Sequence, residues 1–196
     1  MTDTTKDLPM ALTLNVVTTS TRPGRKGPVI AEWFAGFARE HGGFEVVAVD
    51  LKEVGLPLFD EPEHPARQQY QHDHTKRWAA LTDKADAFVF VLPEYNYNPP
   101  PSFFNAVDYL SREWNYKPVG FASYGGVSGG IRAVQAAKPL MTTVKAMPIP
   151  ESLAVQTFTR YIGEKGFEPQ EFHLSSSKAM LDELLKWAGA LKSLRP

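Results

Sequence analysis

The chain has 196 residues, 43% of them hydrophobic, which suits a single α/β domain with a substantial core. A net charge of −1 gives no basic face for nucleic acid. The absence of cysteine excludes disulfides and thiol chemistry, and it is compatible with the cytoplasmic location that we expect.

Residues 1–10 are polar and are predicted to form a frayed tail. The apolar run at 11–17 is interrupted by Thr13 and Asn15, so it is too short and too polar to span a membrane. Five segments are predicted as strands, at 11–17, 44–51, 87–92, 118–124 and within 146–155. The run AFVFVL at 87–92 has the continuous apolar character of a central parallel strand.

Helical patterns separate these strands. Pro28 suits the first turn of a helix, and apolar residues then recur at helical spacing. Further helices are predicted over about 68–84, from 103 onward, over 129–144 with a kink at Pro139, and after a cap at Ser175–Ser177. Residues 158–172 look irregular. The alternation predicts one domain over 1–196, with a doubly wound, five-stranded parallel sheet and helices on both faces.

In such sheets, ligands bind beyond the carboxyl ends of the strands, near the point where strand order reverses. The loop after the first strand, residues 18–27, brings hydroxyls, backbone amides and cations to the start of a helix. This composition favours an anion site, most naturally for the phosphate of a mononucleotide. Neither a Walker A loop nor a dinucleotide fingerprint is present here, and a solvated turn is the alternative.

The loops after the third and fourth strands are also unusual. The third, PEYNYN at 93–98 followed by three prolines, offers aromatic rings and amides suited to a planar heterocycle, or else ordinary Tyr packing and a Pro-terminated turn. The fourth, SYGGVSGG at 123–130, has four glycines that allow the backbone to approach a flat ligand. Each loop alone is a weak signal, but together they predict one site.

The residues of these loops resemble the NADPH-dependent FMN reductase family, which includes flavin, quinone, azo-dye and chromate reductases. The matching blocks are Ser20-Thr21-Arg22, Pro93-Glu94-Tyr95-Asn96 with Pro100, Asn105-Ala106-Val107-Asp108, and 125–133 (GGVSGGIRA). The resemblance covers roughly 11–153. It implies a flavodoxin-like fold with strand order 2-1-3-4-5, FMN as cofactor and NADPH or NADH as co-substrate.

The resemblance also implies roles for residues of all three loops. Ser20 and Arg22 would hold the FMN phosphate, assisted by Arg25 and the backbone of Gly27, Pro28 and Val29. Pro93, Glu94, Tyr95 and Asn96 would line the ribityl chain and ring, and Ser123, Tyr124, Gly125 and Gly126 would close over the ring from the other side. No metal and no obligatory catalytic side chain is expected, because the cofactor supplies the chemistry.

Three residues depart from the family pattern. Thr19 stands where the family usually has Gly, Pro101 also replaces a usual Gly, and Phe104 replaces a usual Lys. The latter two affect acceptor or subunit contacts more than FMN binding. The family implies a homodimer or homotetramer, with residues 55–65 and Trp114-Asn115-Tyr116 as candidate contacts.

Two other features have structural interpretations. Asp108 and Arg112 are spaced for an i,i+4 ion pair on one helix. His72 and His74 are two residues apart on a predicted helix, so we expect them to point in different directions on a solvated face rather than to bind a metal.

The sequence therefore predicts an enzyme that takes hydride from NAD(P)H and reduces a small acceptor (flavin, quinone, azo dye or metal oxyanion) by a ping-pong mechanism. A one-electron flavodoxin-type carrier and a flavin-dependent redox sensor remain alternatives, because this fold hosts many functions. Neither nucleic acid nor a membrane is expected as a partner.

Overall fold

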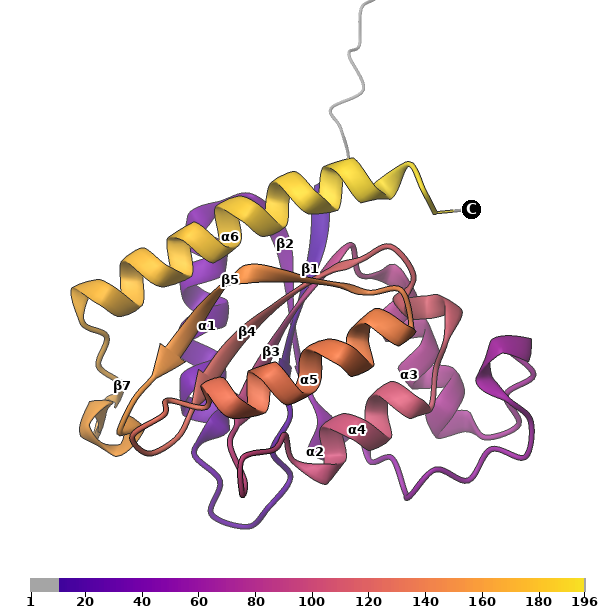
Figure 1. The fold of residues 1–196 in the computed structure, drawn as a ribbon, viewed down its shortest axis with the longest axis horizontal. Coiled ribbons are helices and arrows are strands. Elements are labelled where there is room, and N and C mark those ends of the chain that lie inside the picture. Colours follow the sequence, from indigo (N-terminus) through magenta and orange to yellow (C-terminus); the bar gives the residue numbers. More distant parts are fainter. Residues whose placement is uncertain (1–10, 196) are drawn as a thin grey trace, which may run out of the picture.

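The computed structural model describes residues 11–195 and shows one five-stranded sheet with helices on both faces (Figure 1). The strands are β1 (Leu12–Thr18), β2 (Phe44–Asp50), β3 (Ala87–Pro93), β4 (Pro118–Tyr124) and β5 (Met147–Val155). They are all parallel, in the order β2-β1-β3-β4-β5. The predicted flavodoxin-like order is confirmed.

The helices divide between the two faces of the sheet. Those on one face are α1 (Gly27–His41) and α6 (Glu171–Lys192), and those on the other are α3 (Asp73–Lys84), α4 (Pro101–Asp108) and α5 (Ile131–Thr143). Short elements complete the chain: α2 (Leu51–Val54), η1 (Pro65–Arg67), η2 (Arg112–Trp114), η3 (Phe158–Tyr161) and the hairpin β6 (Ile162–Gly163) and β7 (Gly166–Phe167).

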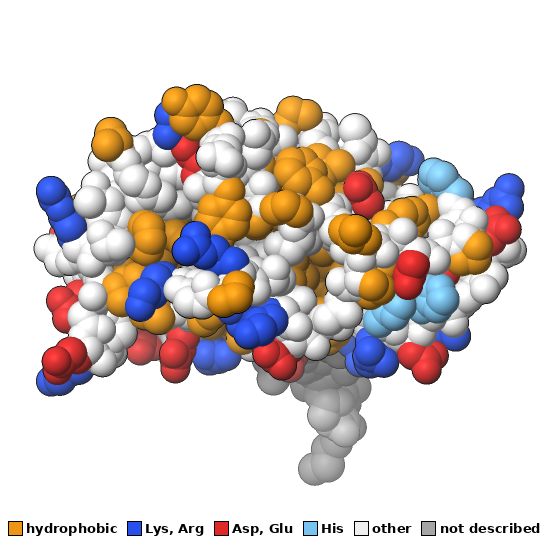
Figure 2. Space-filling view, turned by 90° about the horizontal axis from the view of Figure 1, so that it is seen from below, with side chains coloured by type: hydrophobic (Ala, Val, Ile, Leu, Met, Phe, Trp, Pro, Cys, Tyr) orange, Lys and Arg blue, Asp and Glu red, His pale blue; other side chains and the backbone are white. Residues whose placement is uncertain are grey.

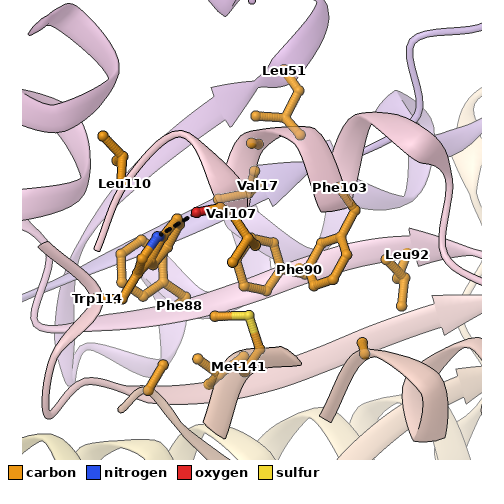
Figure 3. Close-up of a cluster of buried hydrophobic side chains, with 14 of the residues drawn as sticks. Val17, Leu51, Phe88, Phe90, Leu92, Phe103, Val107, Leu110, Trp114 and Met141 are labelled. Carbon is orange, nitrogen blue, oxygen red and sulfur yellow. Dashed lines mark hydrogen bonds between the residues drawn. The ribbon is translucent and has the colours of Figure 1, made fainter. Parts of the chain in front are cut away.

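The strand β3 is buried along its whole length, as its apolar run predicts. Phe88 and Phe90 lie on the face covered by α4 and α5, while Val89 and Val91 face α1 and α6. Figure 3 shows Phe88 and Phe90 beside Trp114, whose indole nitrogen donates a hydrogen bond to the Val107 carbonyl at 3.2 Å. A fully buried indole cannot serve as a subunit contact, so that expectation for Trp114 is wrong.

Several expected boundaries also differ. The last helix begins at Glu171 rather than after Ser175–Ser177, because Gln170 and His173 form a reciprocal capping box there. The predicted helix over 68–84 starts only at Asp73, and residues 158–172 contain η3 and the small hairpin. Pro139 lies inside α5, as expected.

The expected Asp108–Arg112 ion pair is absent from the described part of the chain. The helix α4 ends at Asp108, and Arg112 belongs to the separate turn η2, so the two residues do not share a helix face. An i,i+4 spacing brings side chains together only while the helix continues.

Candidate active site

Three loops meet at the carboxyl end of the sheet, as the sequence predicts. They enclose an open pocket of about 240 Å³. Its lining residues come from loops after β1, β3, β4 and β5, and they are Arg22, Gly24, Arg25, Lys26, Pro93, Glu94, Tyr95, Tyr124, Gly125, Gly126 and Phe158. Figure 2 views this end of the molecule and shows Lys and Arg side chains among exposed hydrophobic ones.

The first loop is fixed from below by Thr19. Its amide and hydroxyl both donate to the Val91 carbonyl of β3, at 3.2 and 2.8 Å. Its carbonyl accepts a hydrogen bond from Ser102 at the start of α4. A glycine at position 19 would lose the hydroxyl bond, so the threonine adds one contact between the first loop and β3.

Ser20 joins the first loop to the third. Its buried hydroxyl lies 2.7 Å from the hydroxyl of Tyr95. The Arg22 guanidinium lies 6.0 Å from the centre of the same ring and is exposed. Ser20 does not itself line the pocket, but it contacts Tyr95, which does, and Arg22 adds a cation near the same ring that suits a phosphate.

Arg25 is already paired, unlike Arg22. Its guanidinium makes a bidentate contact with Asp50, with both N–O distances at 2.5 Å, and donates to the Ser20 carbonyl at 2.7 Å. The hydrogen bond with Asp50 raises the pKa of Arg25 above its ordinary value. The Asp50 carboxylate thus balances most of the positive charge of Arg25, and the bond to the Ser20 carbonyl holds the first loop in place.

The third loop is a tight turn. Tyr95 and Asn98 exchange two backbone hydrogen bonds of 2.9 and 3.0 Å, and the residues between them, Asn96 and Tyr97, have φ of 50° and 71°. Two successive positive φ angles are characteristic of a type I′ turn, which Asn tolerates and Tyr rarely adopts. Tyr97 therefore carries local strain, which is common at binding sites.

An ion pair fastens this turn to the fourth loop. The Glu94 carboxylate, only 6% exposed, accepts hydrogen bonds from the Arg132 guanidinium and backbone and from the Ser128 hydroxyl. Burial would raise the pKa of Glu94, but the bonds from Arg132 and Ser128 outweigh it and hold the pKa below its ordinary value. The Arg132 guanidinium also stacks on the Tyr97 ring, 3.8 Å from its centre.

The fourth loop supplies backbone and an aromatic wall. A Cβ added at Gly126 would meet no atom within 4 Å, so this position is open to a ligand. The Tyr124 ring packs edge-on against Phe158 at 5.2 Å, and burial raises the pKa of its hydroxyl far above the ordinary value. Phe158 is a site residue that the sequence analysis missed, because it follows β5 in a stretch without a recognisable motif.

Six predicted residues do not line this pocket: Ser20, Gly27, Pro28, Val29, Asn96 and Ser123. The Ser123 hydroxyl points inward and donates to the Gly129 carbonyl at 2.8 Å. Gly27 lies beneath Tyr124, where an added Cβ would be 2.7 Å from the phenol oxygen. Pro28 and Val29 follow in the first turn of α1, with Val29 lining a different hollow near Trp33.

A second hollow of about 510 Å³ is also lined by Tyr95. It is lined by Leu58, Tyr95, Asn96, Asn98, Pro99, Pro101, Phe104, Asn105 and Asp108. Two of the three departures, Pro101 and Phe104, thus lie together beside the main pocket. We call this hollow the acceptor-side groove.

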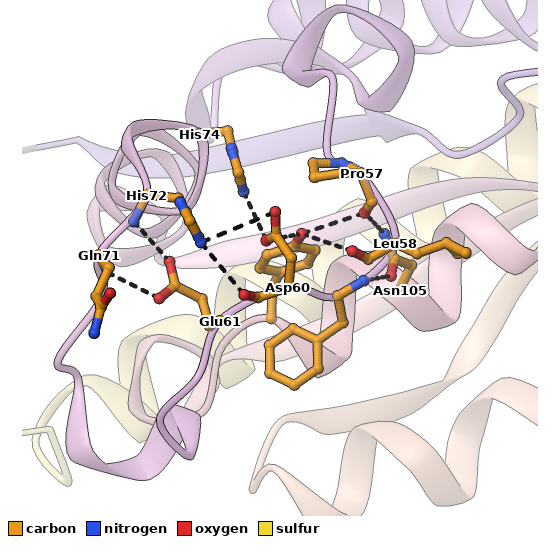
Figure 4. Close-up of polar contacts among 10 residues, drawn as sticks. Pro57, Leu58, Asp60, Glu61, Gln71, His72, His74 and Asn105 are labelled. Carbon is orange, nitrogen blue, oxygen red and sulfur yellow. Dashed lines mark hydrogen bonds and ion pairs between the residues drawn. The ribbon is translucent and has the colours of Figure 1, made fainter.

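The loop over residues 55–64 borders this groove and is anchored by polar contacts. Asn105 holds it through both amide atoms, and Asp60 accepts from Tyr109 at 2.8 Å and contacts His74 at 3.0 Å (Figure 4). The rings of His72 and His74 stack 5.1 Å apart, so the expectation that they point in different directions is wrong. His72 precedes the first turn of α3 as its N-cap, where helical spacing does not yet apply.

The model of the NADPH-dependent FMN reductase family matches residues 13–160. The chain belongs to this family. It is therefore an oxidoreductase with FMN as cofactor and NAD(P)H as the source of electrons.

Relatives and neighbours agree with this FMN reductase assignment. An NAD(P)H-dependent FMN reductase of Schizosaccharomyces pombe is 35% identical over 165 residues, covering 76% of this chain and 82% of the relative. An NADPH azoreductase of Bacillus sp. is 32% identical over 125 residues, covering 63% and 68%. The flavoenzyme FerB of Paracoccus denitrificans shares the fold, with a TM-score of 0.72 at 19% identity over 91% of this chain and 98% of that one.

The pocket of this FMN reductase fits the cofactor that its family implies. Arg22 and Lys26 offer cations near the buried hydroxyl of Ser20, which suits a phosphate, and rings of Tyr95, Tyr124 and Phe158 offer flat walls. The open space at Gly126 permits close approach of a ring to the backbone. In the described residues, no helix is long and apolar enough to cross a membrane.

Proposed function

We propose that this FMN reductase uses NAD(P)H to reduce a small acceptor by a ping-pong mechanism, in which the nicotinamide leaves before the acceptor binds. The convergence of three strand-end loops on one pocket carries the proposal. When bound there, FMN would supply the two-electron chemistry, and the protein supplies binding, orientation and electrostatics.

Each predicted site residue has a proposed task. Ser20 and Arg22 bind the phosphate, and Arg25 orders the loop that carries them through its bonds to Asp50 and the Ser20 carbonyl. The start of α1, at Gly27, Pro28 and Val29, adds the positive end of the helix dipole. This first turn has no side-chain cap.

The other two loops orient the ring and exclude water from one side of it. Pro93 and Tyr95 form one wall, and Asn96 lies beyond them at the edge of the acceptor-side groove. Glu94 acts through Arg132 by holding the two loops together. Gly125 and Gly126, with Tyr124 and Phe158, form the opposite wall, and Ser123 supports it from inside.

We also propose that the enzyme is a homodimer or homotetramer that uses the loop over residues 55–65. Leu58 is 85% exposed there and its neighbour Phe59 is also exposed. Exposed apolar side chains that lie together are typical of interaction surfaces. Analytical ultracentrifugation of the wild type and of Leu58→Glu tests this. A monomeric wild type would contradict it.

An anaerobic spectrum tests the main proposal. The purified protein should carry FMN, and either NADH or NADPH should bleach it completely in a single two-electron phase. Initial rates at several acceptor concentrations should then give parallel double-reciprocal lines. Bleaching that stops after one electron, or that needs a protein partner, would instead favour an electron carrier.

A pair of variants tests the proposed contact between Arg22 and the FMN phosphate. Arg22→Ala should weaken FMN binding to the apoprotein by about tenfold or more, since a charge-assisted phosphate contact contributes about 1.5–3 kcal/mol. The matched control is Arg39→Ala, which removes an exposed arginine from the last turn of α1. Equal FMN affinity in the two variants would contradict the phosphate assignment.

A further inference from the structure

The acceptor-side groove begins where the main pocket ends. Tyr95 lines both hollows, so a molecule in the groove would lie next to one in the pocket. The groove continues past Leu58 and Pro101 toward a third hollow, which shares these residues and Asn105. This geometry gives a small acceptor a binding surface of its own beside the cofactor.

The lining of the groove has a distinct charge pattern. Its apolar surface comes from Pro99, Pro101 and Phe104, together with Leu58 of the proposed subunit contact, and the one charged side chain among its lining residues is the carboxylate of Asp108. The cations that line the main pocket, Arg22, Arg25 and Lys26, do not line the groove, and Lys52 lines only the adjoining third hollow.

The polar groups of the groove are mostly committed. Both amide atoms of Asn105 bond the loop at Pro57 and Phe59, and the Asn98 amide donates to the Asn96 carbonyl at 3.1 Å. The exposed Asn96 side chain at the turn remains in position to donate to a carbonyl oxygen. Such a surface binds a flat, apolar ring with a carbonyl edge and offers no counter-charge to an anion.

We propose that the acceptor-side groove selects neutral quinones over anionic acceptors of the same size, with Phe104 and Asp108 as the residues that determine this specificity. The inference rests on the proposed function and specifies its acceptor. In the balanced reaction, NAD(P)H and one proton reduce the quinone to a hydroquinone and leave NAD(P)⁺. Phe104 contributes apolar contact, and the Asp108 carboxylate repels a negatively charged substituent.

The test compares two acceptors that differ by one charge, 1,4-naphthoquinone and its 2-sulfonate, on FMN-loaded enzyme at pH 8. The measured quantity is the ratio of their kcat/KM values, taken relative to the wild-type ratio so that intrinsic reactivity cancels. Asp108→Lys should shift this ratio toward the sulfonate by about tenfold. The substitution replaces a charge of −1 by +1, and for a sulfonate about 6 Å away in water this reversal changes the interaction by about that factor. High salt should reduce the shift.

The matched control is Glu40→Lys. It makes the same charge change in the last turn of α1, on the opposite face of the sheet, and Asp108 likewise ends a helix, where a cation is well tolerated. The control should leave the ratio unchanged. Phe104→Lys should shift the ratio in the same direction as Asp108→Lys, with loss of kcat/KM for the neutral quinone.

A binding measurement separates recognition from turnover. Calorimetric titration of the loaded enzyme with 2-naphthol and with its 6-sulfonate should show tighter binding of the neutral ligand, and Asp108→Lys should narrow the difference. Equal ratios in Asp108→Lys and Glu40→Lys, with FMN still bleached by NAD(P)H, would overturn the specificity proposal alone. Failure of NAD(P)H to bleach bound FMN would instead overturn the proposed function.

Discussion

The two ends of the five-stranded sheet carry the same kinds of charged residue, but they differ in how many of these charges are paired within the chain. At the amino end, Asp86 accepts from the Thr13 amide at 2.9 Å and from Arg195 at 2.6 Å, and it contacts Lys192 at 3.3 Å. Beside it, the buried Lys117 ammonium donates to two backbone carbonyls of α3, both at 2.8 Å. This end is closed.

At the carboxyl end, only some charges are paired. Arg25 and Arg132 each hold a carboxylate, while Arg22 and Lys26 line an open pocket. The comparison shows how a doubly wound sheet separates stability from binding. Charges that are satisfied within the chain stabilise one end, and charges left facing a pocket at the other end are available to an anionic ligand.

The largest expected effect concerns a backbone position of the binding end. Gly130 has a φ of 88°, and an added Cβ would lie 2.8 Å from the Ser123 Cβ and 2.9 Å from the Tyr124 nitrogen. Gly130→Ala should therefore destabilise the protein by about 3 kcal/mol, from strain and overlap together. Urea unfolding measures this.

Gly126→Ala is the matched control in the same loop. Its Cβ meets nothing, so stability should change by less than about 0.5 kcal/mol. FMN affinity should nevertheless fall, because the new methyl group occupies the space proposed for the ring. Unchanged affinity would mean that the ring lies elsewhere.

At the closed end, Asp86→Ala should cost about 2–3 kcal/mol and leave FMN affinity unchanged. The carboxylate is 10% exposed, and its removal leaves Arg195 and the Thr13 amide without their partner. Burial would raise the pKa of Asp86, but the bonds from Thr13 and Arg195 lower it overall. The stabilisation is thus present above the ordinary carboxyl pKa and lost as pH falls, so the two proteins should converge in acid. A change in FMN affinity would contradict the separation of the two ends.

Lys117 gives a pH dependence of the same sign in an alkaline window. Burial lowers its pKa to about 8 in the folded protein from an ordinary value of 10.5. Between these values the unfolded chain binds more protons, so the free energy of unfolding rises with pH. The wild type should gain about 2 kcal/mol over this range relative to Lys117→Met, measured by denaturant unfolding. Parallel pH profiles of the two proteins would show that the ammonium is not desolvated.

The binding end was the easier of the two to predict from sequence. Glycines, prolines and aromatic residues after β3 and β4 form local turns, so the order of the residues is enough to indicate a site. The parallel sheet follows from the alternation of elements, and the strand order follows from the resemblance. Every such signal is contiguous in the chain.

The closed end depends on contacts between distant segments. Asp86 and Arg195 are 109 positions apart, and neither lies in a motif. The same limit applies within the site. Phe158 follows β5, the partner of Arg25 is Asp50 at the end of β2, and the stacking of His72 on His74 depends on where α3 begins. Tertiary placement decides these contacts, and one sequence does not contain it.

The smallest expected effect comes from removing the partner of Arg25, so that its charge becomes available to a ligand. Asp50→Asn should lower stability by less than about 1 kcal/mol, because Asn still caps α2 at the Lys52 amide while Arg25 loses its counter-charge. The pocket then becomes more positive, and FMN should bind about threefold more tightly at low salt, with a steeper salt dependence. Fluorescence titration of the apoprotein measures both. If affinity falls instead, the Asp50 pair serves to hold the first loop in shape, and pairing and binding are coupled at this end rather than separate.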